Sequence, residues 1–556
     1  MTMRGKEVAI WCALAALLLV ANLVRWGGPG YGYDSYQYLS AAENINAGRG
    51  ASTSIVNFDI ERVSGRVPAP LTTFPPGYSF AIAQLNRIGI EVDRAGLLVS
   101  MLSFVALFPL LAWGARTLEL TPNITRLVFV WLLANSWATN YSLKILSEST
   151  FAALTTAAVV ALMAAERRQQ TAHRGFVGAG ALLVGSVLVG LSYWVRYAGL
   201  FLFAAVLAYF ALTAALRRDR RSLSALLCCT IPLGIIGLGV ARNIFLTSTW
   251  QGGNTKQVFH PVVSILKEFM VSSYHLFFGD KVSARFGVVE VMLLCAALTL
   301  GMLAIHAVRK GSALRAWKAP HRAPLVLLVS YLAIYCLGMI YVGVFSVISF
   351  GTRMFYPILP LLLLALGYLL GDVDKAIQTT SSRRRLLHIL NGSTALLTVC
   401  YFAINARSLQ VKPAPAPAQL TNARFAAPGV DGRSLRSWVD AHIPRDAIII
   451  TTEAQGTFYA LKRKTVALTE SGFSDVVWDE SHVETLMVSY GAYFLILYPS
   501  AESGVAAAQR ESAFLAGLLA GRRPPWLRLA AENQDVKVFR RLADLPLQTP
   551  LVAQRF

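Results

Sequence analysis

Long apolar runs alternate with short polar stretches along most of this chain. The first run covers residues 7–26, and a helix needs roughly 18–20 consecutive apolar residues to cross a bilayer. The pattern predicts a multi-span α-helical membrane protein with about eleven transmembrane helices in residues 1–405. The later runs cover residues 95–114, 126–144, 148–165, 176–194, 197–216, 222–246, 287–308, 324–349, 354–371 and 386–405.

The loops between these runs alternate in charge. One set is rich in arginine and lysine, whereas the intervening turns carry single cations at Lys144, Arg196 and Arg353. Basic loops stay on the cytoplasmic side. The pattern therefore predicts a multi-pass inner (plasma) membrane protein with a cytoplasmic N-terminus and an uncleaved first span. The basic loops are residues 166–174, 217–221, 309–322 and 381–385.

Two longer polar segments, residues 27–94 and 247–286, interrupt the runs on the exterior side. In the first of them, Asp34 stands where an N-cap residue would precede a helix that ends near Gly48. Pro76 favours the start of a second surface helix that continues to about Ile88. The first helix carries an apolar stripe at helical spacing, made of Tyr38, Ala41, Ala42 and Ile45.

The C-terminal part changes in character. A Pro/Ala-rich linker covers residues 406–421, and residues 422–556 predict a separable, soluble, extracytoplasmic α/β domain. Within it, the positions Lys462, Arg463 and Lys464 are expected to form a solvated turn. Strands are predicted at residues 447–452, 493–498 and 535–541, and helices at 453–461, 480–490 and 502–519.

Composition supports the membrane assignment and argues against both a soluble protein and a nucleic-acid-binding protein. The chain is 55% hydrophobic and 15% charged, with a mean hydropathy of +0.51, which a soluble protein of this length would not show. The net charge of +21 lies mainly in the short loops, so no nucleic-acid partner is expected. All six cysteines fall in apolar runs, and neither a disulfide framework nor a zinc site is expected.

Ionisable residues at membrane depth are costly, and they are functional candidates when several gather at one face. Each one alone has an ordinary explanation, such as a helix cap for the aspartate or a lipid headgroup contact for an arginine. Arginine suits phosphate binding, and a carboxylate can take a proton from an incoming hydroxyl. The residues at exterior span ends, expected to surround one cavity, are Asp34, Glu148, Arg196, Arg242 and Arg353.

The order of these features resembles polyprenyl-phosphate-dependent glycosyltransferases of the GT-C fold, in the group of bacterial protein O-mannosyltransferases and lipid A aminoarabinose transferases. The resemblance covers roughly residues 5–405. Where that family often has two adjacent acids, Ser35 follows Asp34 here, a departure from the protein mannosyltransferase pattern. The matching stretches are YDSYQYLSAAENINAGRG, FPPGY, Ser147-Glu148, Arg196-Tyr197, Arg242-Asn243 and RMFYPILP.

The resemblance implies a glycosyltransferase that moves a sugar from a polyprenyl-phosphate-linked donor to an extracytoplasmic glycan, lipid or protein by inverting displacement. It makes Asp34 the catalytic carboxylate. No cofactor is required, and no ligand spacing supports a divalent metal ion. The residues expected to bind substrate are Glu148, Arg196, Arg242, Arg353, Tyr38 and Tyr356.

Two other functions remain open from the sequence alone. A transporter or flippase of lipid-linked sugars would also place arginines at the interface, but it is expected to show internal repeats, which this chain lacks. A non-catalytic membrane scaffold would bind partners through its α/β tail and would not require the charged residues to converge.

Overall fold

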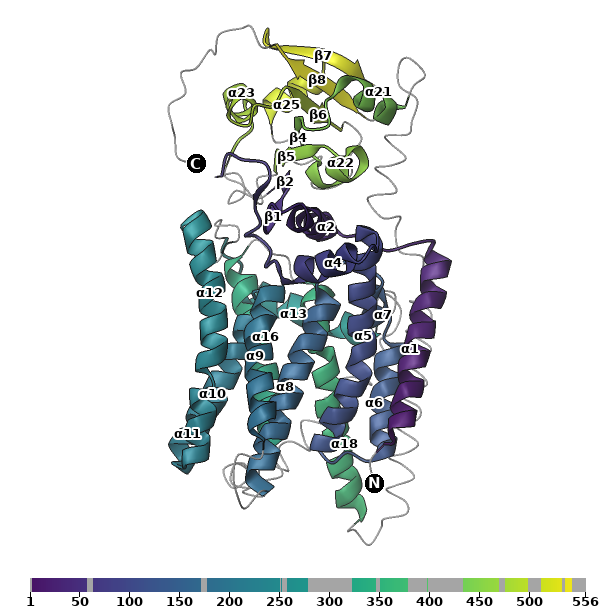
Figure 1. Ribbon diagram of the computed structural model, residues 1–556, viewed down its shortest axis with the longest axis vertical. Coiled ribbons are helices and arrows are strands. Elements are labelled where there is room, and N and C mark those ends of the chain that lie inside the picture. The colour runs from purple at the N-terminus through teal and green to yellow at the C-terminus, as the bar shows by residue number, and fades with distance from the viewer. Residues whose placement is uncertain are drawn as a thin grey trace.

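A bundle of long helices carries two short helices and an α/β layer at one end, and the N-terminus lies at the other end (Figure 1). The computed structural model describes residues 3–57, 64–171, 178–250, 252, 258–278, 323–346, 351–378, 398, 434–469, 476–498, 512–532 and 536–542. The predicted spans 287–308 and 386–405 (residue 398 apart) and the linker 406–421 lie outside the described residues.

Within these described ranges, seven helical segments are long and apolar enough to cross a membrane, and two shorter apolar helices accompany them. They coincide with the predicted spans up to residue 371, while the total of about eleven stays a prediction. The long segments are α1 (Gly5–Trp26), α5 (Val92–Thr117), α8 (Glu148–Thr171), α10 (Gly199–Arg217), α11 with α12 (Arg220–Leu227, Thr230–Thr247), α16 (Ala323–Phe345) and α17 with η2 and α18 (Thr352–Phe355, Tyr356–Ile358, Leu359–Gln378); the shorter ones are α6 (Pro122–Ala134) and α9 (Ala179–Val195).

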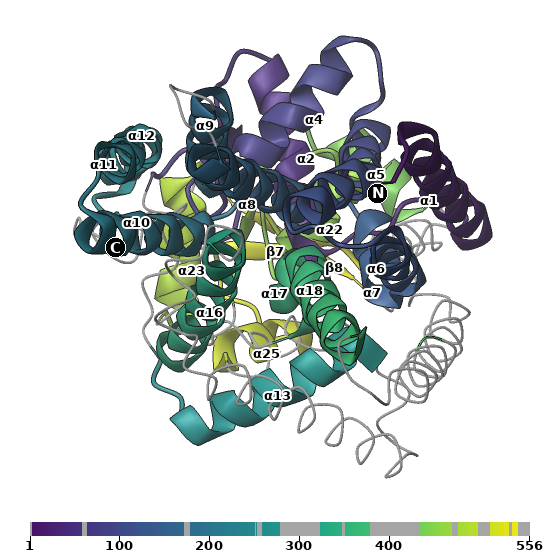
Figure 2. The ribbon, with the colours of Figure 1, turned by 90° about the horizontal axis from the view of Figure 1, so that it is seen from below.

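Helix α8 lies inside the bundle, between α5 and α9 (Figure 2). The two helices can approach closely because Gly185 of α9 has no side chain. A Cβ atom added there would lie only 2.7 Å from the Leu162 side chain of α8. The outer helices instead expose large apolar side chains, such as Val24 at 76% and Phe245 at 88%. An apolar outer surface around a packed interior is what a lipid environment favours.

Two predicted spans are interrupted. The run 126–144 is divided at Asn135, whose extended backbone (ψ 115°) ends α6 and whose side chain accepts the Ala138 N–H at the start of α7 (Ser136–Ser142). The run 222–246 is divided at Cys228 and Cys229, between α11 and α12. The residues at both breaks lie inside hydrophobic runs, so hydropathy alone did not reveal them.

Helix α2 (Tyr33–Asn46) lies between the bundle and the C-terminal layer, and α4 (Gly77–Arg87) packs beside it (Figure 1). The predicted apolar stripe is buried as expected. The N-cap assignment was wrong, because the helix begins after Gly32, whose N–H donates to Ser35 Oγ at 2.8 Å. Asp34 is therefore the second residue of the helix, and its carboxylate is held by an arginine described below.

In the described part of the C-terminal layer, six strands form one sheet in the order β2-β5-β4-β6-β8-β7. Strands β2, β5, β4 and β6 run parallel, and β7 and β8 complete the sheet in antiparallel fashion. The strands are β2 (Ile55–Val56), β4 (Ile448–Thr451), β5 (Lys464–Ala467), β6 (Phe494–Leu497), β7 (Leu527–Glu532) and β8 (Lys537–Arg541); the helices are α21 (Leu435–His442), α22 (Ala454–Leu461), α23 (Glu480–Ser489) and α25 (Ala513–Leu519).

Strand β2 comes from the first exterior segment, about 400 residues before its partner strand, with Ile55 opposite Thr465. In the same segment, β1 (Ser52–Thr53) and β3 (Ala69–Pro70) pair with each other. The domain division at residues 406–421 stays a prediction. A C-terminal domain separated from the rest of the chain at that point would lack β2, the edge strand of its sheet.

The prediction that Lys462, Arg463 and Lys464 form a solvated turn is wrong for two of the three residues, because Arg463 is buried and Lys464 begins strand β5. Arg463 has a side chain only 3% exposed, and it donates to the carbonyls of Ile443 at 2.8 Å and Leu461 at 2.9 Å. A long cation is buried here because backbone acceptors satisfy its donors, whereas Lys462 takes a left-handed conformation that ends α22.

Candidate active site

Asp34 projects from the first turn of α2, at the junction between the bundle and the C-terminal layer (Figure 1). The chain before the helix is fixed by a short parallel bridge, in which the Gly30 N–H donates to Leu143 O at 2.9 Å and the Ile145 N–H donates to Gly30 O at 3.0 Å. A carboxylate in the first turn also lies in the favourable end of the helix dipole. The first exterior segment therefore holds Asp34 against the turn that precedes α8.

Arg353 joins the two predicted carboxylates. It lies on α17, a single helical turn that Tyr356 and Pro357 close on its C-terminal side. Its Nη2 donates to Asp34 Oδ2, and its Nε donates to Glu148 Oε1. Three segments that are far apart in the sequence thus meet at one guanidinium.

Glu148 is the first residue of α8, and its side chain is fully buried. Arg196, at the break between α9 and α10, donates to Glu148 Oε1 at 2.8 Å and to Ser147 Oγ at 3.0 Å. The Tyr38 hydroxyl lies 2.9 Å from the same Ser147 Oγ. Tyr38 and Arg196 therefore belong to the network around Asp34 and Arg353.

Lys144, an isolated cation in the sequence, lies beside this network. Burial, and then the neighbouring charge of Arg353, lower the pKa of Lys144 from its ordinary value of 10.5. Its ammonium group also lies 5.7 Å from the centre of the Tyr141 ring. The signal available in the sequence was its position four residues before Glu148 in an exterior turn.

The cationic side chains in and beside this network outnumber the carboxylates by one. Two carboxylates, Asp34 and Glu148, face the three cations Lys144, Arg196 and Arg353. Guanidinium groups form bidentate contacts with phosphate oxygens, and an unbalanced cation in a partly buried site favours an anionic ligand. The arrangement can therefore hold an anion and keep a carboxylate next to it.

Tyr356 supports the site from inside the bundle. It is fully buried, and its hydroxyl lies 3.2 Å from Ser149 Oγ and 3.5 Å from Ser142 Oγ. Its ring stacks on Tyr141 with centroids 5.3 Å apart. These contacts direct its hydroxyl to serines of α7 and α8, so in this structure Tyr356 packs beneath the network and is not bonded to its carboxylates.

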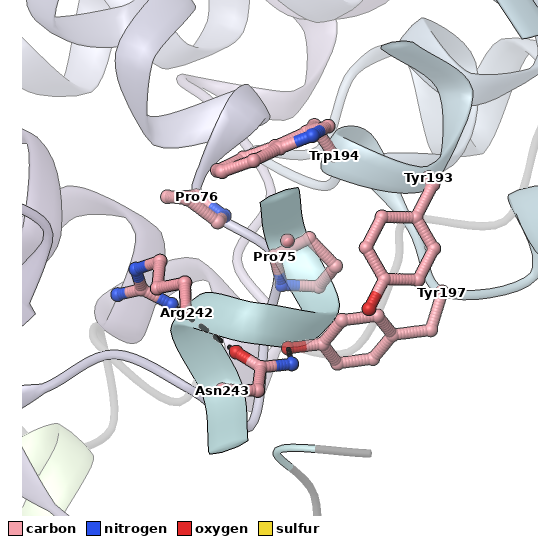
Figure 3. A pocket seen from close by; sticks show the side chains of 8 residues that line it. Pro75, Pro76, Tyr193, Trp194, Tyr197, Arg242 and Asn243 are labelled. Carbon is pink, nitrogen blue, oxygen red and sulfur yellow. Dashed lines mark hydrogen bonds between the residues drawn. The ribbon is translucent and has the colours of Figure 1, made fainter. Parts of the chain in front are cut away.

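Arg242 lies outside the network, so the prediction that it shares one cavity with the other four ionisable residues is wrong. On α12 it donates to Leu71 O at 2.9 Å and to Ala51 O at 3.2 Å, and a dashed line in Figure 3 marks its contact with Asn243 Oδ1. It lines a small cleft of about 10 Å³ together with Pro75, Pro76, Tyr193, Trp194, Tyr197, Gly239 and Asn243 (Figure 3).

That cleft has room for about one water molecule. The Tyr197 hydroxyl donates to Thr72 O at 2.5 Å and accepts from Asn243 Nδ2 at 3.1 Å. Together with Arg242, these side chains hold the backbone of the first exterior segment on both sides of its β1–β3 pair. Of the five ionisable residues expected to share one cavity, four therefore converge in the network, and Arg242 forms a separate anchor.

A larger hollow of about 430 Å³ opens beside the network, between α13 (Val262–Phe278) and the start of α17. Thr352 in its wall immediately precedes Arg353, and polar residues of α13 form the facing wall. Among the described residues, no group of three histidine, cysteine or acidic side chains could hold a metal ion. The lining residues are Ser264, Lys267, Glu268, Val271, Ser272, His275, Gly351 and Thr352.

The structure of this chain is similar to solved structures of membrane enzymes. No protein-family model and no curated protein matches the chain. The crystal structure of ArnT from Cupriavidus metallidurans bound to undecaprenyl phosphate matches with a TM-score of 0.57 at 12% identity, covering 99% of this chain and 100% of that one. The oligosaccharyltransferase from Archaeoglobus fulgidus, tethered with an acceptor peptide, matches with a TM-score of 0.57 at 12% identity, over 92% of this chain and 72% of that one.

The arabinofuranosyltransferase AftD from Mycobacteria gives a TM-score of 0.50 at 14% identity, over 98% of this chain and 40% of that longer one. Together these similarities show that the chain has the GT-C fold and is a multi-pass membrane protein with an α/β layer. The fold class predicted from the sequence is confirmed. At such low identity the similarity shows the fold alone.

Proposed function

We propose that this protein transfers a sugar from a polyprenyl-phosphate-linked donor to an extracytoplasmic acceptor, with Asp34 as the catalytic base. The observation that carries the proposal is the guanidinium of Arg353, which contacts both Asp34 and Glu148. The GT-C fold adds support, since the similar ArnT structure holds undecaprenyl phosphate.

In this mechanism the acceptor hydroxyl donates its hydrogen bond to Asp34. Its oxygen attacks the anomeric carbon of the donor sugar while the bond from that carbon to the lipid phosphate oxygen breaks. The proton passes to Asp34, and the phosphate leaves with the bonding electron pair. Attack opposite the leaving group inverts the configuration, and a positioned base contributes roughly 10²–10⁴ in rate.

The cations hold the departing phosphate. Arg353 and Lys144 are the groups we assign to its oxygens, with Arg196 keeping Glu148 in place through its 2.8 Å contact. Phosphate oxygens compete with Asp34 for the Nη2 group of Arg353. Donor binding thus releases Asp34 to accept the hydrogen bond of the acceptor, and the same cations stabilise the charge that develops on the leaving group.

We assign the end of the bundle that carries the site to the extracytoplasmic face of the inner membrane. The basic loop 217–221 lies at the opposite end, between α10 and α11 (Figure 1), and basic loops remain cytoplasmic. The N-terminus of α1 lies at that cytoplasmic end as well. The donor and the acceptor then reach Asp34 from the outer leaflet and the exterior space.

The test compares envelope glycans and glycoproteins by mass spectrometry in a strain without this protein and in strains that carry wild type, Asp34→Asn or Asp446→Asn. Asp446 is an exposed tail aspartate and serves as the matched control. We expect one glycan to lose a sugar in the deletion strain and to be restored by wild type and by Asp446→Asn only. Full restoration by Asp34→Asn would contradict base catalysis and favour a flippase, and an unchanged glycan profile would favour a scaffold.

A further inference from the structure

One tyrosine of the C-terminal layer reaches the start of the helix that carries Asp34. The Tyr459 hydroxyl, on α22, donates to Asp93 Oδ2 at 2.6 Å. The Tyr31 hydroxyl donates to the same oxygen at 2.8 Å, and the two hydroxyl oxygens lie 3.0 Å apart. Asp93 lies in the first turn of α5, so one carboxylate joins the bundle, the first exterior segment and the tail.

The rings of this group enclose the start of α2. Tyr31 stacks on Tyr36 with centroids 5.7 Å apart and planes at 6°. The Tyr459 ring packs against both, at 5.3 Å from Tyr31 and 5.2 Å from Tyr36. Because Tyr31 and Tyr36 lie on either side of Asp34 in the chain, the Tyr459 contact restrains the backbone on both sides of the proposed base.

The same backbone is also fixed by the bundle, through the bridge of Gly30, the residue before Tyr31, to the residues around Lys144. Asp34 therefore sits on a short segment held between two supports, one from the turn before Glu148 and one from the tail. Its carboxylate has Arg353 as its partner among the described residues. The direction of the carboxylate depends on where these supports place the helix.

The tail has other attachments to the exterior segment. Strand β2 pairs with β5, and Ala454 and Phe458 pack with Tyr36 and Ile55 in one buried cluster. The Lys462 ammonium also lies 3.8 Å from Glu43, although exposed pairs of this kind contribute little. Loss of the Tyr459 hydroxyl would leave these contacts in place, so its effect on position can be separated from detachment of the tail.

We propose that Tyr459 is a positioning residue, through which the C-terminal layer sets the placement of Asp34 for sugar transfer. The proposal rests on the function proposed above. It assigns to the tail a part in the reaction that the network around Asp34 and Arg353 alone does not reveal. Small displacements of a reacting group lower rates strongly, by up to about 10²-fold for 1 Å.

The test variant is Tyr459→Phe, which keeps the ring packing and removes the hydroxyl. Its control is Tyr493→Phe. Tyr493 belongs to the same layer, directly before β6, and is 45% exposed. Its ring packs against the Arg541 guanidinium, away from the group of Tyr31, Tyr36 and Tyr459. Each protein is reconstituted in liposomes with a synthetic undecaprenyl-phosphate sugar that wild type turns over. The measurements are kcat, KM, affinity for undecaprenyl phosphate, Tm and hydrogen exchange of the α2 amides.

We expect Tyr459→Phe to lower kcat about tenfold, with KM, undecaprenyl phosphate affinity and Tm close to those of the control. Exchange of the amides at the start of α2 should rise in this variant alone. The double variant Tyr31→Phe/Tyr459→Phe should fall little further, because both hydroxyls serve one Asp93 oxygen.

Unchanged kcat and unchanged α2 exchange in Tyr459→Phe would overturn the proposal, and so would a loss of kcat that only follows a loss of folded protein. If wild type turns over no donor, the proposed function fails on its own. The hydrogen exchange of α2 then decides by itself whether Tyr459 positions this helix.

Discussion

Two arginines at the same end of the bundle have different partners. Arg353 contacts the carboxylates of Asp34 and Glu148, whereas Arg242 contacts the backbone carbonyls of Ala51 and Leu71. Both residues looked alike in the sequence, as single cations at exterior span ends. They differ in their acceptors: an anionic ligand can replace the carboxylates that Arg353 contacts, but it cannot replace the backbone carbonyls that Arg242 holds.

An arginine that donates to backbone carbonyls cannot readily turn to a ligand, because the buried carbonyls would then lack a hydrogen-bond donor, which costs free energy. Carboxylates paired with a guanidinium can be replaced by another anion such as phosphate. The comparison therefore separates a site arginine from an anchoring arginine. The predictions below test this separation, beginning with the largest effect on transfer.

Asp34→Asn should reduce sugar transfer by about 10²–10⁴, the usual contribution of a positioned base. Asparagine keeps the size of the side chain but cannot take the acceptor proton. Helix α2 should remain folded, because Gly32 and Ser35 form its cap. Initial rates and undecaprenyl phosphate affinity in liposomes are the measurements. Near-wild-type turnover would make Glu148 the next base to test.

Arg353→Lys should lower transfer roughly 10- to 100-fold, since hydrogen bonds to charged groups contribute about 1.5–3 kcal/mol. Lysine keeps the charge but cannot bridge Asp34 and Glu148 as a planar fork does. Both kcat and the donor KM should change, because the cation acts on bound donor and on the departing phosphate. A variant that changed KM alone would limit Arg353 to binding.

Lys144→Gln should weaken undecaprenyl phosphate binding about fivefold, as expected for an ion pair of about 1 kcal/mol. Because burial lowers the pKa of Lys144 below 10.5, wild type should lose this part of its affinity as the pH rises through the lowered value. The Gln variant should lack that decline. Binding measured from neutral pH to 10.5 compares the two; parallel curves would place Lys144 outside the phosphate site.

Arg242→Gln should change transfer per folded molecule less than about twofold while lowering the free energy of unfolding by about 1–3 kcal/mol. The loss arises because the carbonyls of Ala51 and Leu71 lose their charged donor. Thermal unfolding in detergent and initial rates report the two quantities separately. A loss of transfer as large as that of Arg353→Lys would show that the two arginines do not differ as proposed.

Much of the fold was predictable because a bilayer imposes simple rules on a sequence. The apolar runs indicated the positions of the described spans. The stripe of Tyr38, Ala41, Ala42 and Ile45 is buried as its pattern predicts, but Gln37 and Ser40 of α2 are buried as well, because the C-terminal layer covers the rest of the helix. The breaks at Asn135 and at Cys228–Cys229 were missed, since hydropathy averages over the single backbone turns that end a helix.

The sequence by itself determined which ionisable residues lie at the ends of spans, because these positions follow from counting apolar residues. Only the tertiary structure decided which of them meet. Arg353 reaches Asp34 across 319 residues of chain, and β5 finds its edge partner in the distant Ile55–Val56. Such pairings arise from how helices and strands pack in three dimensions, and residue types and local spacing carry no record of them.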